Sequence, residues 1–196
     1  MEFYNISGLT AGYEGFLPVR GLNARLPKQG VAAVSGRSGV GKSTLLRALT
    51  GLLSPVSGDI DQGFLALKKA VVFQEDRLLP WLTAGENVAI VREGGEEEAR
   101  RLLEAVGLSG FLGAYPDELS GGMKRRVALA RAMHYGGGAL ILDEPFKGLD
   151  AQLRERVCET VKGMFPLTVI ATHDMYEARL LCPAGQPMEI IDLNSY

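Results

Sequence analysis

A glycine-rich segment between two apolar runs constrains the fold of this sequence more than any other feature. Residues 31–34 (VAAV) form a compact apolar run that is typical of a buried strand. Residues 36–44 (GRSGVGKST) follow as a turn, and leucines then recur at helical spacing through residue 53, before Ser54 and Pro55 mark a stop. The order of strand, glycine turn and helix predicts an α/β fold.

The turn matches the pattern G-x-x-x-x-G-K-[ST], which predicts a phosphate-binding loop. Glycines let backbone N–H groups turn toward phosphate oxygens, and the following helix presents the positive end of its dipole. Lys42 would place its charge on the β- and γ-phosphates of a nucleotide, and the Ser43 hydroxyl would bind Mg²⁺. The predicted nucleotide-binding residues of this loop are Gly36, Ser38, Gly39, Val40, Gly41, Lys42, Ser43 and Thr44.

A second apolar run, residues 139–142 (ALIL), ends in two carboxylates, Asp143 and Glu144. This order places both side chains at the carboxyl edge of a buried strand, where α/β sheets bind their ligands. Asp143 is predicted to hold Mg²⁺ through water, and Glu144 to polarise the water that attacks the nucleotide. A capping role at the strand end is the alternative interpretation of Asp143.

Composition sets the class of protein. The chain has 196 residues, 46% hydrophobic and 22% charged, which is ordinary for one globular domain and excludes intrinsic disorder. A net charge of −2 gives no general electrostatic reason to bind nucleic acid, and Cys158 and Cys182 cannot form a disulfide framework. No apolar run approaches the ~18 residues needed to cross a bilayer, and residues 1–10 lack the features of a secretory signal.

Predicted strands alternate with predicted helices along the chain, apart from one long helical stretch. The predicted segments are strands with turns at 1–35 and 56–74, helices within 77–135 with Ser120 as an N-cap, a helix at 151–164, and strands at 167–171 and 189–191. This alternation predicts a mostly parallel sheet. We expect a single domain over residues 1–196, with an α/β core of residues 1–76 and 136–196 and a helical subdomain of residues 77–135.

With these motifs assembled, the sequence resembles the ATP-binding subunits of ABC transporters over nearly its whole length. The most specific element is LSGGMKRR at residues 119–126, which is similar to the family's signature, usually LSGGQ. Five motifs occur in the family's order and spacing: the glycine-rich loop, Gln74, the signature, residues 139–150 (ALILDEPFKGLD) and residues 171–174 (ATHD). The resemblance implies a P-loop NTPase of the ABC type, whose mostly parallel core sheet carries an N-terminal antiparallel β part and a helical insertion.

The resemblance also implies roles for single residues. Tyr13 stands where the family places an aromatic residue that stacks on adenine, with Phe16 as a nearby competitor. Gln74 would contact Mg²⁺ or the lytic water and sense the permease. His173 would contact the γ-phosphate, and Asp150 matches the loop that reaches across the dimer. The implied catalytic set is Lys42, Gln74, Glu144 and His173, and the implied metal set is Ser43, Gln74 and Asp143.

The signature residues Ser120, Gly121 and Gly122 open a helix, so their N–H groups and hydroxyl form a second anion site. In the family this helix start binds the γ-phosphate of ATP held by the other subunit. The implied active unit is therefore a head-to-tail dimer with two ATP molecules between the chains, which ATP closes and hydrolysis reopens. Met123, in place of the usual Gln, and Lys147, where a small residue is commoner, depart from the family pattern.

Residues 73–88 (FQEDRLLPWLTAGENV) look like the importer subgroup that serves nitrate, sulfonate, taurine and related small solutes. The segment begins the helical stretch, where the family docks its permease, so Trp81 is expected at a partner contact or in ordinary core packing. The resemblance implies transmembrane permease subunits as direct partners and a substrate-binding protein as an indirect one. It also implies a peripheral position on the cytoplasmic face of the inner (cell) membrane. Other subunits select the cargo.

Three other interpretations stay open. A non-transport ABC ATPase of DNA repair or translation usually carries long coiled-coil insertions or two tandem cassettes, and neither fits in 196 residues. A small P-loop kinase leaves the signature and His173 unexplained. A degenerate binding-only subunit is suggested only by Lys147. The basic run at residues 124–126 lies on the signature helix of a net-acidic chain, so nucleic acid is not expected as a partner.

Overall fold

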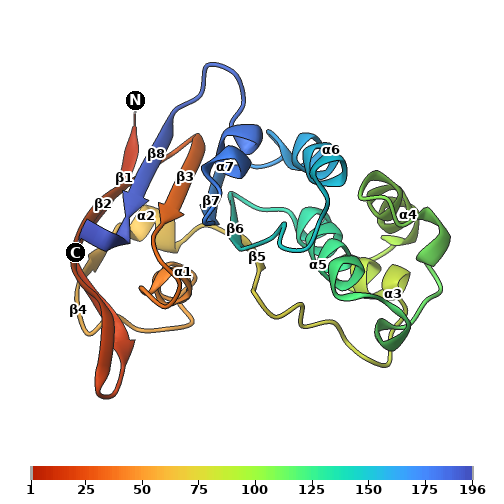
Figure 1. Cartoon of the computed structure of the whole chain (residues 1–196), viewed down its shortest axis with the longest axis horizontal. Coiled ribbons are helices and arrows are strands. Elements are labelled where there is room, and N and C mark those ends of the chain that lie inside the picture. The colour runs from red at the N-terminus through yellow and green to blue at the C-terminus, as the bar shows by residue number, and fades with distance from the viewer. Residues whose placement is uncertain (1, 196) are drawn as a thin grey trace.

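The computed structural model describes residues 2–195, and within them the chain forms two β-sheets flanked by helices (Figure 1). The larger sheet is parallel, with the strand order β5-β6-β7-β3-β8. Its strands are β3 (Gly30–Ser35), β5 (Lys69–Val72), β6 (Ala139–Asp143), β7 (Leu167–Ala171) and β8 (Met188–Asp192). The mostly parallel sheet predicted from the alternation of strands and helices is confirmed.

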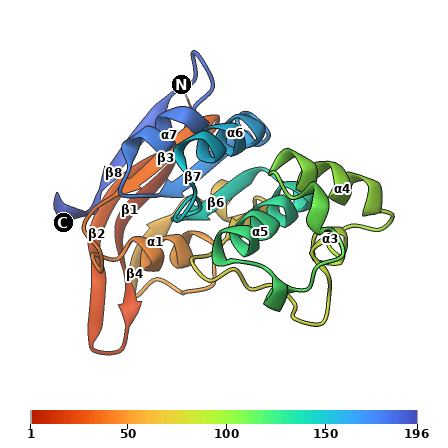
Figure 2. The same cartoon turned by 45° about the vertical axis from the view of Figure 1, so that its right-hand side comes forward.

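A smaller antiparallel sheet contains the N-terminal strands, in the order β2-β1-β4. β1 (Phe3–Tyr13) and β2 (Phe16–Pro27) form a long hairpin, and β4 (Ser57–Ile60) pairs with the other edge of β1. This is the N-terminal antiparallel part that the resemblance implies. In Figures 1 and 2 it lies at the opposite end of the molecule from helices α3 (Ala84–Ala89), α4 (Glu96–Ala105) and α5 (Gly121–Tyr135).

The parallel strands are buried on both faces, because their alternate residues enter two different cores. On β3, Val31 and Ala33 belong to one core, whereas Ala32 and Val34 belong to the other. The first core includes apolar side chains of α3–α5, and the second includes those of helix α1 (Lys42–Leu49) and of the antiparallel sheet. Packing from both sides therefore fixes the carboxyl edge of the sheet, where the predicted motifs lie.

In the helical stretch between β5 and β6, two of the helices begin with a side-chain cap. Thr83 and Glu86 form a capping box at the start of α3. Ser120 is the N-cap of α5, as predicted, and its hydroxyl oxygen accepts a hydrogen bond from the Met123 N–H at 3.3 Å. Short 3₁₀ turns, η1 (Ser109–Phe111) and η2 (Pro116–Glu118), connect α4 to α5. Within residues 2–195, no helix has the length and apolar character needed to cross a membrane.

The remaining helices differ from the sequence pattern in three places. α1 ends at Leu49, short of the leucines at 52 and 53, because Gly51 turns the chain with a left-handed φ of 77°. Asp61 caps a short helix, α2 (Gln62–Leu65), in a stretch predicted as strands. α7 (Met175–Leu181) has no counterpart among the predicted helices. The other elements are α6 (Ala151–Val161) and η3 (Leu193–Ser195).

Candidate active site

The glycine-rich loop lies between β3 and α1, at the carboxyl edge of the parallel sheet. Gly36 and Gly41 have φ values of 147° and 113°, which residues with a side chain rarely adopt. A Cβ on Gly41 would also lie 2.9 Å from the Pro18 side chain, and one on Gly36 would lie 2.7 Å from Val40. The backbone path of the loop therefore requires the glycines that define its motif.

Lys42 is 7% exposed although it carries a charge. Its Nζ donates hydrogen bonds to the carbonyl oxygens of Gly36 at 2.8 Å and Arg37 at 3.2 Å, both within the loop. A buried ammonium needs oxygen partners, and phosphate oxygens are partners of the same kind. The loop thus holds a lysine whose charge faces the inside of the turn.

The start of α1 is open to an anion. Gly41 is the N-cap, no side chain caps the first turn, and no acidic residue lies in it. The first N–H groups of a helix have no partner within the helix, and the helix dipole makes this end positive. These features fit a phosphate group bound between the loop and α1.

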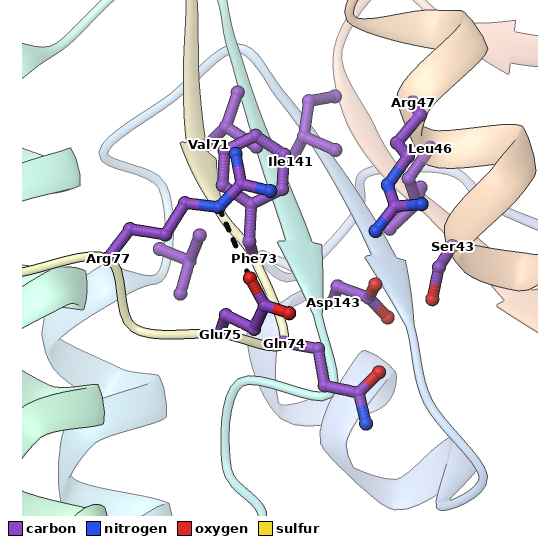
Figure 3. A pocket seen from close by; sticks show the side chains of 11 residues that line it. Ser43, Leu46, Arg47, Val71, Phe73, Gln74, Glu75, Arg77, Ile141 and Asp143 are labelled. Carbon is purple, nitrogen blue, oxygen red and sulfur yellow. Dashed lines mark ion pairs between the residues drawn. The ribbon is translucent and has the colours of Figure 1, made fainter. Parts of the chain in front are cut away.

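Two adjoining pockets open at this edge of the sheet, and Ser43 and Gln74 line both. The strand-edge pocket, of about 330 Å³, is lined by Ser43, Leu46, Arg47, Val71, Val72, Phe73, Gln74, Glu75, Arg77, Ile141 and Asp143 (Figure 3). The phosphate pocket, of about 290 Å³, is lined by Phe16, Ser38, Gly39, Gly41, Lys42, Ser43, Thr44, Gln74, Glu144 and Lys147.

Asp143 ends β6 and is 7% exposed. Burial raises the pKa of its carboxyl, although a hydrogen bond with Ser43 and the charges of Lys42 and Arg47 oppose the rise. Figure 3 shows the side chains of Ser43, Asp143 and Gln74 around the same space. A cation in that space would offset the unfavourable burial of the carboxylate.

The oxygen atoms of these three side chains fit Mg²⁺. A hydroxyl, a carboxylate and an amide oxygen are hard ligands, and Mg²⁺ usually binds one or two carboxylates together with water and substrate phosphates. Within residues 2–195, no group of three His, Cys, Asp or Glu side chains could hold a metal ion. The hydroxyl, carboxylate and amide oxygens of Ser43, Asp143 and Gln74 fit a cation that binds together with nucleotide phosphates.

Glu144 lines the phosphate pocket in a left-handed conformation, with a φ of 46°. A residue other than glycine is strained there and needs neighbours that hold it. Its N–H donates to the Ala171 carbonyl oxygen at 2.9 Å, and its own carbonyl oxygen accepts from Arg125 at 3.1 Å. Its carboxylate Oε2 lies 3.7 Å from the Lys147 Nζ. Glu144 is thus held where a general base could act on water beside a bound phosphate.

Two aromatic residues lie at the turn of the β1–β2 hairpin. Phe16 lines the phosphate pocket and is 60% exposed. Tyr13 pairs with Phe16 across the hairpin, and its hydroxyl oxygen accepts a hydrogen bond from Arg47 at 2.6 Å. Both rings are available to a base, and the adenine-stacking role of Tyr13 stays a prediction.

The other residues implied by the resemblance lie outside the two pockets. Asp150 caps α6, and His173 is exposed just past the end of β7. Residues 120–122 begin α5, and a Cβ on Gly122 would lie 3.7 Å from the Gly148 carbonyl oxygen of the loop before α6. One chain therefore brings together Lys42, Ser43, Gln74, Asp143 and Glu144, but holds the signature apart from them.

Two arginines at the site, Arg47 and Arg125, were not predicted from the sequence. Arg47 lies one helical turn after Ser43 on α1, and this i, i+4 spacing is the signal that could have placed it at the site. Arg125 belongs to the basic run at residues 124–126, which alone gives no sign of what its side chains bind. In the structure Arg125 donates to the carbonyl oxygens of Gln74 and Glu144.

The fold and the site together define a P-loop nucleotide-binding domain. Its features are a parallel α/β sheet, a glycine-rich loop before a helix, a buried loop lysine and a serine–aspartate pair at the strand edge. The ABC transporter family matches residues 19–147 of the chain. With this match, the chain belongs to the ABC transporter family, and it is an ATP-binding ATPase subunit of that family. The predicted family, its importer-like subgroup and the fold class are confirmed.

The relatives include proteins named for import. The aliphatic sulfonates import ATP-binding protein SsuB of Escherichia coli (strain K12) is 39% identical over 183 residues, which cover 88% of this chain and 72% of that protein. The aliphatic sulfonates import ATP-binding protein SsuB 3 of Paraburkholderia xenovorans (strain LB400) is 42% identical over 183 residues, covering 90% of this chain and 73% of that protein.

Solved structures of a bacterial ABC transporter cassette, MJ0796, share the fold. Its dimeric structure superposes with a TM-score of 0.80 and 27% identity, covering 97% of this chain and 94% of that one. A dimeric post-hydrolysis state of the same cassette, bound to ADP and Pi, has a TM-score of 0.79 and 25% identity over the same shares of the two chains.

Proposed function

We propose that the chain is the ATP-hydrolysing motor of an importer for a small solute of the sulfonate, nitrate or taurine class. The observation that carries the proposal is the convergence of Lys42, Ser43, Gln74, Asp143 and Glu144 on two adjoining pockets. Relatives at 39% and 42% identity are named for import of aliphatic sulfonates, which supports the solute class.

The glycine-rich loop binds the triphosphate in this proposal. Lys42 exchanges the carbonyl oxygens of Gly36 and Arg37 for oxygens of the β- and γ-phosphates, so its charge stays paired throughout. The open N–H groups at the start of α1 donate to the same phosphates. Tyr13 stacks on the adenine.

Ser43, Asp143 and Gln74 hold Mg²⁺, with Asp143 acting through water. Held there, the cation would supply positive charge that offsets the negative charge of the phosphates. The buried Asp143 carboxylate, whose pKa burial raises, is suited to the task because a cation restores a favourable partner to it.

Glu144 accepts a proton from the water that attacks the γ-phosphate. Its two peptide groups are fixed by Ala171 and Arg125, so its carboxylate is positioned without an adjustment of the backbone. His173 contacts the γ-phosphate once the nucleotide is bound.

Hydrolysis takes place between two chains that associate head to tail. Residues 120–122 line neither pocket of their own chain, which supports their action on the ATP of a second copy. Asp150 reaches across the same interface. The dimeric structures of MJ0796 support this arrangement, one of them with ADP and Pi bound. A homodimer that forms on ATP binding is the simplest active unit.

The chain acts from the cytoplasmic face of the membrane, docked on permease subunits that receive solute from a binding protein. The α/β core of residues 1–76 and 136–196 carries every residue that lines the two pockets except Arg77, and the helical subdomain of residues 77–135 carries the permease contact. Trp81, 69% exposed at the start of that subdomain, is available to such a contact.

ATP turnover of the purified chain, with Mg²⁺ and with EDTA, tests the enzymatic part of this proposal. We expect Mg²⁺-dependent turnover that falls at least about 100-fold in Glu144→Gln while ATP still binds, because a general base contributes 10²–10⁴-fold. The matched control is Glu104→Gln on the exposed side of α4. Unchanged turnover in Glu144→Gln contradicts the base assignment, and a phosphorylated metabolite formed with ADP would identify a kinase instead.

Vesicles that contain the permease test the import part. We expect binding protein loaded with an aliphatic sulfonate, nitrate or taurine to stimulate hydrolysis by the docked chain several-fold over unloaded binding protein. Stimulation by DNA or ribosomes and not by the permease would instead identify a non-transport ATPase.

A further inference from the structure

The guanidinium of Arg125 on α5 connects three parts of the active site. Its Nε lies 2.9 Å from Asp76 Oδ1, its Nη1 donates to the Glu144 carbonyl oxygen at 3.1 Å, and its Nη2 donates to the Gln74 carbonyl oxygen. The Arg125 side chain is 13% exposed and that of Asp76 is 17% exposed. All three nitrogens of the guanidinium are thus committed in a nearly buried position.

The segments that Arg125 binds are strained. Among residues 2–195, the residues other than glycine that have a positive φ are Arg77, at 47°, and Glu144, at 46°. Such residues persist only where the surroundings fix them, and they cluster at functional sites. One lies in the 73–77 loop, and the other lies at the end of β6.

α5 binds the carbonyl oxygen of both strained residues. Arg125 donates to Glu144, and Arg131, further along the same helix, donates to Arg77 at 3.0 Å and to Asp76 at 3.2 Å. With the contact to Gln74, α5 holds the backbone of the 73–77 loop at Gln74, Asp76 and Arg77. Of these two arginines, Arg125 alone bonds both to this loop and to the segment that carries Glu144.

We propose that Arg125 is a positioning residue that sets the Gln74 side chain and the Glu144 carboxylate relative to each other. A planar guanidinium donates in a fixed fork, so two carbonyl oxygens bound to it keep a fixed separation. A lysine carries one nitrogen and cannot reproduce this geometry. The inference rests on the proposed function, since it concerns the same hydrolytic site.

The same contact couples the site to the signature. α5 starts at Gly121, directly after its N-cap Ser120, and carries Arg125 within its second turn. A shift of α5 when residues 120–122 meet a second chain would therefore move the Gln74 and Glu144 backbones together. Through Arg125, α5 would therefore align the Gln74 and Glu144 backbones at the two pockets.

Steady-state kinetics and thermal unfolding of Arg125→Gln and Arg125→Lys test the proposal. We expect Arg125→Gln to lower kcat about 10- to 100-fold with the KM for ATP changed less than about threefold, because misplacement of a catalytic group by 1 Å can lower the rate about 100-fold. We expect Arg125→Lys to recover less than a tenth of the lost kcat. If Arg125→Gln lowers the Tm but keeps kcat within threefold of wild type, Arg125 has only a structural role and the proposal is overturned.

A double-mutant cycle measures the coupling between two substitutions in kcat, which a general loss of fold stability does not change. Since Arg125 sets Gln74 relative to Glu144, Arg125→Gln should lower kcat by a smaller factor in a Gln74→Ala background than in wild type. The matched control is Lys68→Gln, which removes a cation that donates to the Tyr135 carbonyl oxygen at 2.7 Å and lines neither pocket. Its effect should multiply with that of Gln74→Ala. Multiplying effects for Arg125→Gln as well would overturn the proposal.

If Arg125→Gln does not fold, Asp76→Asn replaces it, because this change removes the ion pair and keeps the guanidinium. We then expect kcat to fall about three- to tenfold, and no change would overturn the proposal. If wild type hydrolyses ATP and the Arg125 and Asp76 variants have the kcat of wild type, the positioning role of Arg125 is contradicted and the proposed function stands. A wild-type chain without turnover, or with Glu144→Gln fully active, contradicts the proposed function instead.

Discussion

The Lys147 ammonium lies 3.7 Å from the Glu144 carboxylate. The residue proposed as the general base therefore forms an ion pair with the residue three positions after it. The Lys147 side chain is 61% exposed and that of Glu144 is 20% exposed. A pair that solvent reaches to this extent contributes only about 0.2–1 kcal/mol. Lys147 therefore competes only weakly with water for the Glu144 carboxylate.

Removing this cation should leave the Glu144 carboxylate free to bind the attacking water. We expect Lys147→Ala to raise kcat by about two- to fivefold, the factor that corresponds to the loss of less than 1 kcal/mol of competing attraction. Lys162→Ala is the control, since it removes an ion pair of the same i, i+3 spacing, with Glu159, at the far end of α6. Steady-state turnover at saturating Mg·ATP checks the prediction. A fall in kcat of tenfold or more would show that Lys147 assists hydrolysis.

Substitution at Tyr13 and Phe16 identifies the aromatic ring that stacks on the base. Loss of base stacking on an aromatic side chain weakens binding by about 1–3 kcal/mol, so Tyr13→Ala should raise the KM for ATP at least about fivefold. Tyr13→Phe keeps the ring and removes the hydroxyl that accepts from Arg47, so it should bind nearly as wild type. A larger effect of Phe16→Ala than of Tyr13→Ala would transfer the role to Phe16, which lines the phosphate pocket.

Asp143→Asn should stabilise the chain without nucleotide while abolishing Mg²⁺-dependent turnover. Burial raises the pKa of Asp143 above its ordinary value of 3.8, so the folded state binds this proton more tightly than the unfolded state. The free energy of unfolding therefore falls as pH rises from 3.8 through the raised pKa, and the Asn variant escapes that loss.

Thermal unfolding between pH 3 and 8, without nucleotide, checks this prediction. The Tm difference between Asp143→Asn and wild type should be positive at neutral pH and shrink toward acid. Asp117→Asn, at an exposed carboxylate in η2, is the control and should show no such trend. A lower Tm for Asp143→Asn at neutral pH would mean that the partners of Asp143 outweigh its burial.

Ser120 has a structural role as a helix cap and a proposed role in catalysis. Thr83, which caps another helix, is the control that separates the two roles. Each hydroxyl oxygen caps a helix, so Ser120→Ala and Thr83→Ala should each lower the free energy of unfolding by about 1 kcal/mol. Only Ser120→Ala should also lower kcat, by about tenfold or more, because it removes a donor from the second anion site. ATP binding to the isolated chain should stay unchanged in both. Equal kcat values for the two variants would contradict the signature's role.

Local patterns were enough to predict the elements that carry the nucleotide loop. The VAAV strand, the glycines after it and the N-cap at Ser120 depend on residues next to each other in sequence, and the structure has them where the pattern places them. The end of α1 was not predictable in this way. Leucines 52 and 53 keep the helical spacing, but Gly51 leaves the helix and Leu52 is 62% exposed.

The contacts of Arg125 could not be derived from sequence, because they join segments 49 to 51 and 19 residues apart along the chain. A basic side chain on a helix is usually solvated, and its use as a donor to backbone carbonyl oxygens appears only when the helix is packed. Likewise, the strained φ of Glu144 results from bonds to Ala171 and Arg125 that the motif does not encode.

ATP-dependent dimerisation of Glu144→Gln, measured by light scattering beside the ATPase rate of wild type, tests whether ATP is hydrolysed between two chains. Glu144→Gln should bind ATP and hardly hydrolyse it, so the closed state should accumulate. We expect a monomer without ATP and a doubled mass with ATP, and we expect Ser120→Ala in the same chain to restore the monomer. A persistent monomer that binds ATP tightly would contradict the head-to-tail arrangement, because residues 120–122 would then have no second nucleotide to act on.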